Sequence, residues 1–237
     1  MLVVAALLAA APGGARADEA AGSWGTPVGF EASLGTRFPL EFGIDVAAEA
    51  PYGLTAHLGL GWMPHVYRDL INDAAVGFDL YEDADAALVA AALEDAVLLS
   101  PTIGWRPPPL GGFEVYAGYV LTFLGGSVTR AEAEEISGED LGGAGAGVAE
   151  VPLSGKAHGF QLGVAYQAAL APHLSLRLSL AYFQIVSASA GIDVEVQGAA
   201  AQRIVDRVEA RLDERVDELL SSYVKAPLLG VSGVWRF

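Results

Sequence analysis

Acyl chemistry is the first reactivity to consider, because the chain carries four histidines and several serines. A histidine that activates a serine beside an oxyanion site is the usual machinery for cleaving or moving an acyl chain. The histidines are His57, His65, His158 and His173, and the serines considered with them are Ser100, Ser127 and Ser187. No Gly-x-Ser-x-Gly motif or comparable arrangement links the two groups, so the sequence assigns no catalytic residue.

Cation binding is the second candidate, and the densest run of carboxylates is Glu82-Asp83-Ala84-Asp85. Carboxylates bind calcium or magnesium, but this run lacks the glycine and the spacing of a dedicated calcium loop. A solvated acidic surface is therefore favoured over a divalent-cation site, which stays open as an alternative. The chain has no cysteine, so disulfides and thiolate metal sites are excluded. We expect no cofactor.

Nine charged residues share one face of segments in which apolar and polar residues alternate. Side chains at alternate positions of a strand point to opposite faces of the sheet. If the apolar face points outward, these nine all point inward: Glu31, Arg37, Glu41, Asp45, Glu49, Arg106, Glu114, Arg177 and Arg236. Because an unpaired ion in a confined interior is costly, we predict a lumen charge network of ion pairs. A path for ions or protons is the less favoured interpretation.

The elements that must position these charges are eight strands. The alternating segments are 28–37, 40–49, 52–62, 97–106, 113–123, 160–168, 174–182 and 225–237. Short connections alternate with long ones, at about 63–96, 125–157 and 187–223. A soluble β-sandwich would also alternate, but the strict short-long order and outward aromatic residues near strand ends favour a membrane barrel. We predict an all-β membrane barrel of about eight antiparallel, up-and-down strands.

The end of the chain resembles the terminal signature of bacterial outer-membrane β-barrel proteins. Val231, Trp235 and the final Phe237 lie on alternate positions of the last predicted strand. The resemblance is at superfamily level, with small eight-stranded barrels of the OmpA and OmpX type as analogues. It implies an outer-membrane location, contact with outer-membrane lipid, and recognition of the C-terminal strand by the assembly machinery.

A signal peptide is predicted at residues 1–17, because a short apolar segment ends in Ala15-Arg16-Ala17. Cleavage near Ala17 would leave 18–237 as a single transmembrane barrel domain. An exported protein without a long apolar helix is consistent with spanning the membrane by strands.

The three long connections are predicted to form an acidic, partly helical extracellular cap. They hold 22 of the 29 acidic residues and seven of the 13 basic ones, in a chain of net charge −16. Apolar residues at helical spacing predict helices at 67–76, 83–98 and 199–222. The negative charge argues against nucleic acid as a partner. An extracellular partner or a divalent cation at the acidic loops is the remaining possibility.

The function favoured by the sequence is non-enzymatic: an outer-membrane barrel that displays this cap for envelope structure, adhesion or ligand binding. An outer-membrane lipid-modifying enzyme is the alternative. A narrow solute channel is a weaker one, because eight strands enclose a space that side chains can fill.

Overall fold

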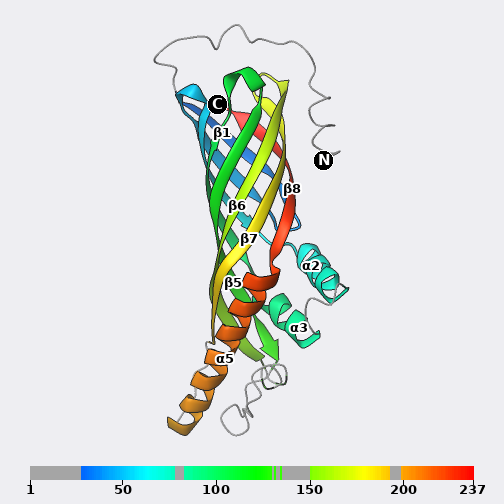
Figure 1. The fold of residues 1–237 in the computed structure, drawn as a ribbon, viewed down its shortest axis with the longest axis vertical. Helices are drawn as coiled ribbons and strands as arrows, with labels where there is room; N and C mark the ends of the chain where they lie inside the picture. The colour runs from blue at the N-terminus through cyan, green and yellow to red at the C-terminus, as the bar shows by residue number, and fades with distance from the viewer. Residues whose placement is uncertain (1–27, 78–82, 130, 132–133, 135–149, 193–198) are drawn as a thin grey trace.

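Eight antiparallel strands close into one barrel in the computed structural model, which describes residues 28–77, 83–129, 131, 134, 150–192 and 199–237 (Figure 1). The strands are β1 Gly29–Phe38, β2 Glu41–Glu49, β3 Leu54–Trp62, β4 Val97–Trp105, β5 Phe113–Thr129, β6 Glu150–Ala171, β7 Leu174–Ile192 and β8 Lys225–Arg236. Each strand pairs with its neighbours in sequence, and β8 closes the barrel on β1. The predicted up-and-down barrel is confirmed. The predicted signal peptide, 1–17, lies outside the described residues.

The two ends of the barrel differ in their connections. At one end, here called the turn end, the connections are short and include the 3-10 helices η1 Pro51–Gly53 and η2 Pro108–Leu110. At the other, the helical end, only the β1–β2 turn is short, and the longer connections carry the helices α2 His65–Gly77, α3 Asp83–Ala92 and α5 Ala199–Tyr223. The C-terminus lies at the turn end (Figure 1). The predicted alternation of short and long connections is therefore present from β2 onward.

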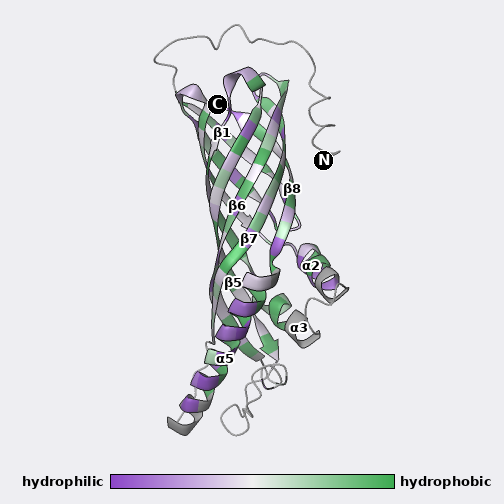
Figure 2. Cartoon of the chain, viewed as in Figure 1, coloured by the Kyte–Doolittle hydropathy of each residue, from purple (hydrophilic) through white to green (hydrophobic). Residues whose placement is uncertain are grey.

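The outer wall of the barrel is apolar and its inner face is polar. Along β3, Leu54, Leu58 and Leu60 are each about half exposed, whereas Thr55 and His57, on the opposite face, are buried. Aromatic side chains gather toward both rims of this wall: Tyr52, Trp105 and Trp235 near the turn end, and Trp62, Phe123 and Tyr182 near the helical end. Figure 2 shows the alternation of hydrophobic and hydrophilic residues along the strands. This distribution is the reverse of a soluble protein, in which the exposed face is polar.

Three strands continue beyond the rim that the others share. β5, β6 and β7 pair with one another out to Thr129, Glu150 and Ile192, so the connections predicted at 125–157 and 187–223 are shorter than expected. In this three-stranded extension the polarity is inverted. Its outer face carries exposed Ser154, Lys156, Ser187 and Ser189, and its inner face carries buried Val128, Val151, Leu153 and Ala190.

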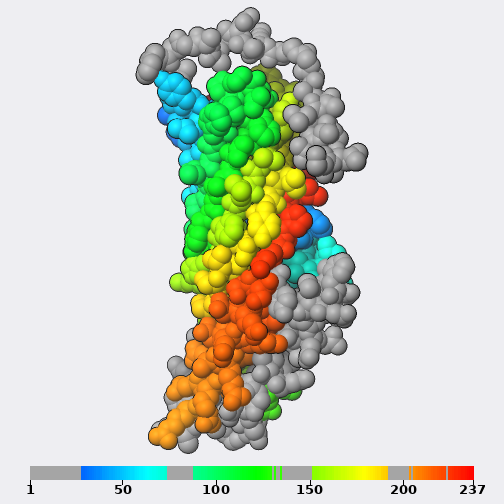
Figure 3. All heavy atoms as spheres, viewed as in Figure 1, coloured from blue at the N-terminus to red at the C-terminus, as the bar shows by residue number. Residues whose placement is uncertain are grey.

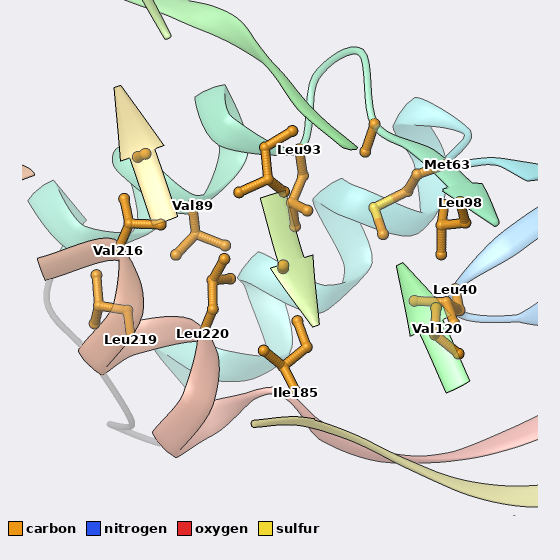
Figure 4. Packing of buried hydrophobic residues seen from close by; sticks show 14 of the residues in the cluster. Leu40, Met63, Val89, Leu93, Leu98, Val120, Ile185, Val216, Leu219 and Leu220 are labelled. Atoms are coloured by element: carbon orange, nitrogen blue, oxygen red, sulfur yellow. The ribbon is translucent and has the colours of Figure 1, made fainter. Parts of the chain in front are cut away.

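α3 and α5 pack on the inner face of the extension and complete an apolar core, and α2 packs against α3 (Figure 4). The predicted apolar stripe of α5 is buried there at Val208, Leu212, Val216, Leu219 and Leu220. Leu88, Val89 and Leu93, from α3 and the turn after it, face these residues. Figure 3 shows α5, in orange, lying along the lower part of the molecule.

The first long connection differs in detail from its prediction. The helix expected at 67–76 is present as α2, but the one expected at 83–98 ends at Ala92. Leu98 belongs to β4 and points into the barrel, where it is fully buried. None of the helices in the described part of the chain is long and apolar enough to cross a membrane.

Candidate functional site: the charged lumen

The lumen charge network begins at the turn end, where two arginines share two glutamates. The Arg106 guanidinium donates to Glu49 at 2.7 Å and to Gln167 at 3.0 Å, and it lies 3.5 Å from Glu31. Arg236 donates to the same Glu31 at 2.6 Å and lies 3.8 Å from Glu49. Both arginines lie near strand ends, so this cluster occupies the lumen just inside the turns.

Glu114 is the centre of the network. One carboxylate oxygen accepts from Thr55 at 2.8 Å and lies 2.9 Å from Nε2 of His57. The other accepts from Arg106 at 3.2 Å and lies 3.3 Å from Arg177. The residue is only 1% exposed. This carboxylate is held in one position, because moving it would leave the buried charges of Arg106 and Arg177 less compensated.

His57 extends the network from Glu114 toward the helical end. Its Nδ1 lies 3.0 Å from Asp45, so the ring is held between two carboxylates. Arg177 stacks above the Tyr116 ring at 5.5 Å from the centroid. An aromatic face attracts a guanidinium electrostatically, which leaves the N–H donors at the edge of the Arg177 guanidinium free to reach Glu114.

Arg37 and Glu41 form the last cluster, nearest the helical end. Arg37 Nε donates to Glu41 at 2.7 Å, and its terminal nitrogens donate to Ser100 at 2.6 Å and to Gln161 at 3.1 Å. In the described part of the chain, Oε2 of Glu41 and Nε2 of Gln161 have no hydrogen-bond partner.

Inward-facing glycines make room for these charged groups. A Cβ on Gly104 would lie 2.5 Å from Glu114 Oε1, and one on Gly61 would lie 2.9 Å from Glu41 Oε2. Real Cβ contacts are essentially never this short. Gly61 and Gly104 therefore leave the volume that the carboxylates of Glu41 and Glu114 occupy.

The structure brings together all nine charged residues that the sequence placed on the inner face, and each has a partner of opposite charge or His57 within the lumen. Sequence reasoning missed the neutral members Gln161, Gln167, Thr55 and Ser100. Gln161 and Gln167 lie an even number of residues apart on β6, so they share its inner face. That spacing is the signal that could have identified them.

The remaining space in the lumen is small. A cavity of about 70 Å³ is lined by residues that include Asp45, His57, Tyr116, Arg177 and Ser232. This is room for a few water molecules. Toward the helical end the inward residues become apolar and buried, among them Leu40, Leu98, Val120, Phe183 and Leu228. Apart from this cavity, ion pairs occupy the lumen toward the turn end and buried apolar side chains occupy it toward the helical end.

The candidate catalytic histidines are not brought together. His57 lies in the lumen, His158 lies on the outer face next to Tyr119, with which it hydrogen-bonds, His65 begins α2, and His173 lies in the β6–β7 turn. No group of three or more potential metal ligands occurs among the described residues. The acidic run at 82–85 begins outside the described residues, and the side chains of its other members are not described.

The C-terminal signature residues lie on the outer face of β8. Val231 and Trp235 are each about half exposed, and Phe237 is the most exposed of the three. The backbone N–H of Phe237 donates to the carbonyl of Phe30 at 3.0 Å. This bond holds the chain end against β1, where the barrel closes.

The fold and the filled lumen define a class: a small, eight-stranded, up-and-down antiparallel barrel with a polar interior and an apolar wall. No protein-family model matches the sequence, and no curated protein does. Among solved structures, the chain is similar to a major outer membrane protein from Thermus thermophilus, with 19% identity, 90% of this chain and 100% of that chain covered, and a TM-score of 0.49.

It is also similar to the N-terminal β-barrel domain of Pseudomonas aeruginosa OprF, with 9% identity and a TM-score of 0.38. That match covers 89% of this chain and 96% of that chain. For Acinetobacter baumannii CarO the identity is 12% and the TM-score is 0.34. That match covers 90% of this chain and 98% of that chain.

Proposed function

We propose that this protein is a non-enzymatic outer-membrane barrel that is anchored by its apolar wall and displays a folded cap at the cell exterior. The observation that carries the proposal is the change of polarity along β5, β6 and β7. Below Phe123, Phe160 and Tyr182 the outer face is apolar and the ion pairs line the inner face. Beyond them the inner face is apolar and the outer face, apart from Val186, is polar. A continuous sheet changes in this way where it passes from lipid into water.

The helical end is the external end in this proposal. Barrels of the bacterial outer membrane have short periplasmic turns and longer external loops. Here three of the four short connections and the C-terminus lie at one end, and α2, α3 and α5 lie at the other. The apolar core between the helices and the extension supports a cap that is folded rather than a set of loose loops. A folded external surface suits adhesion or the binding of a ligand or partner.

The filled lumen favours this display function over a solute channel. Ion pairs occupy the lumen from Arg236 to Glu41, and apolar side chains close it toward the cap. The separation of the histidines likewise offers nothing specific in favour of the lipid-modifying alternative.

The test uses single cysteines, because the natural chain has none. Glu214→Cys lies on the exposed face of α5, and Ala171→Cys lies at the exposed turn end. Intact cells that express each variant are treated with a maleimide that cannot cross membranes. We expect labelling of the variant at 214 in intact cells, and of the variant at 171 only after the cells are opened.

The barrel itself is checked on the same samples. Folded barrel in unboiled detergent should migrate differently from the boiled chain, because closed pairing leaves no strand edge to fray. Labelling of 171 but not of 214 in intact cells would reverse the orientation. Identical migration before and after boiling would contradict the membrane barrel.

A further inference from the structure

The positively charged residues of this chain are divided by type. Four of the described arginines lie in the lumen network and the others lie on α2 and α5. The chain has only two lysines, Lys156 and Lys225. Both are exposed on the outer face of the barrel, one on β6 and one on β8, with β7 between them. Among the described residues, the two lysines are therefore the basic side chains on the outer face of the strands.

Lys156 lies where the outer face turns from apolar to polar. Its cross-strand neighbours are Phe123 on β5, which is 40% exposed, and Ser189 on β7. Four residues further along β6, Phe160 faces outward on the apolar side of the boundary. The ammonium group thus has aromatic surface on one side and hydroxyl-bearing residues on the other.

Lys225 lies at the same kind of boundary two strands away. It pairs with Gln184 on β7, which accepts a hydrogen bond from the exposed Tyr182 at 3.0 Å. Gln184 in turn pairs with Phe160 on β6. The two lysines therefore flank one outward-facing aromatic group, made by Phe160 and Tyr182, whose ring centroids lie 6.3 Å apart.

Neither lysine forms an ion pair with a described residue, although the chain has 29 acidic residues. A lysine at a membrane boundary lays its alkyl stem along apolar surface and keeps its ammonium group at the level of the headgroups. A compact ammonium ion is also a good partner for phosphate. Lipid phosphates are strong anions at the level of the headgroups.

We propose that Lys156 and Lys225 form a binding surface for the phosphate groups of anionic lipid on the β6–β8 side of the barrel. The surface includes the aromatic group between the lysines, against which acyl chains would pack. This inference rests on the proposed membrane location.

The test uses the full-length barrel, folded into phosphatidylcholine vesicles that contain either phosphorylated lipid A or the same lipid with its phosphates removed. Retained lipid is counted by native mass spectrometry after gentle extraction. Lys156→Gln with Lys225→Gln should lower retention of phosphorylated lipid A roughly 25-fold, because each lysine near an anionic surface contributes about a factor of five. Arg203→Gln, which removes one exposed charge from α5, is the control and should leave retention unchanged.

Two further arms separate the possible explanations. Lys156→Arg with Lys225→Arg should keep most of the binding, because arginine retains the positive charge, and the glutamine variant should stay heat-modifiable, so its loss of binding is not a failure to fold. Inorganic phosphate should not displace the lipid, because the acyl chains contribute to binding. Equal retention of both lipids by the natural protein, or equal retention by the glutamine variant, overturns the lysine site while leaving the membrane barrel intact. A chain that does not become heat-modifiable in these vesicles overturns the membrane proposal itself.

Discussion

The carboxylate of Asp213 on α5 accepts a hydrogen bond from the backbone N–H of Ala190 on β7 at 2.8 Å. One helical turn later, Asp217 accepts from the N–H of Ala188 at 2.6 Å. Successive turns of a helix rise by about 5.4 Å and alternate residues of a strand by about 6.6 Å, so the two spacings nearly match. β8 pairs with β7 only as far as Gln184. Beyond that point the helix supplies acceptors that a neighbouring strand would otherwise provide.

The edge of β7 should therefore open when these carboxylates are removed. Asp213→Ala with Asp217→Ala leaves two backbone donors without partners, at a cost of about 1–3 kcal/mol each. We expect faster amide hydrogen exchange at 188 and 190, with unchanged exchange in the barrel strands. Glu214→Ala, on the exposed face of the same helix, is the matched control. Unchanged protection at both alanines would show that the apolar stripe alone holds α5 in place.

The position of the lipid boundary can be tested with one residue type on both sides of it. Leu58→Arg places a charge on the outer wall near the middle of β3 and should cost about 2–4 kcal/mol of folding free energy in phospholipid vesicles. Ser189→Arg places the same charge on the outer face of the extension. Because that face is proposed to lie in water, the change should have little effect. Similar costs at the two positions would contradict the proposed boundary.

Glu114 should be the least replaceable charge in the lumen. Glu114→Ala removes one carboxylate, so the buried positive charges of Arg106 and Arg177 each lose an anionic partner. Breaking a buried ion pair on one side costs about 3–5 kcal/mol, and urea unfolding in detergent measures it. Asp69→Ala removes an exposed carboxylate that pairs with Arg68 and should cost no more than about 1 kcal/mol. A small loss in both variants would mean that water replaces the carboxylate in the lumen.

Removal of the α5 segment should separate the cap from the barrel. With residues 199–222 replaced by a short Gly/Ser linker, the apolar residues of the extension lose their cover and β7 loses its acceptors. We expect a less stable cap but a barrel that remains heat-modifiable and does not conduct ions in planar bilayers, because the lumen network is intact. Degradation before insertion would place α5 in the folding core, and measurable conductance would show that the cap, not the lumen, closes the barrel.

Most of the barrel could be predicted from the sequence because lipid outside and ion pairs inside force opposite polarity on alternate residues. The inner positions of Glu31, Asp45 and Glu114 follow from that rule alone. The pairing of Glu114 with Arg106 and Arg177 does not, because it depends on the stagger between strands that are far apart in sequence. The spacing of these residues along the chain does not predict how the strands are staggered.

The three-stranded extension was missed for a different reason. On β5 the outward Phe123 is followed by the inward Leu124 and Val128, so the apolar residues change face at the boundary. If the apolar residues are assumed to face outward along the whole strand, the alternating pattern ends at Phe123, and the residues after it resemble a loop. The register shift between His158 and Gly159 adds to the effect in the pairing of β6 with β7. For the alanine-rich stretch before β4 the error was the opposite one, since the predicted helix was too long. Residues that favour a helix continue up to Leu98, which belongs to β4.

The hydroxyl-bearing outer face of the extension also fixes how deeply the molecule can sit. Ser154, Ser187 and Ser189 cannot enter hydrocarbon without losing water, and the same rigid ladder carries the apolar wall immediately below them. A thicker bilayer therefore cannot be matched by sliding the barrel outward or inward, because the turn end and the extension limit movement in both directions. The bilayer must become thinner around the protein instead. The height of the apolar wall therefore favours membranes whose hydrocarbon core has the same thickness.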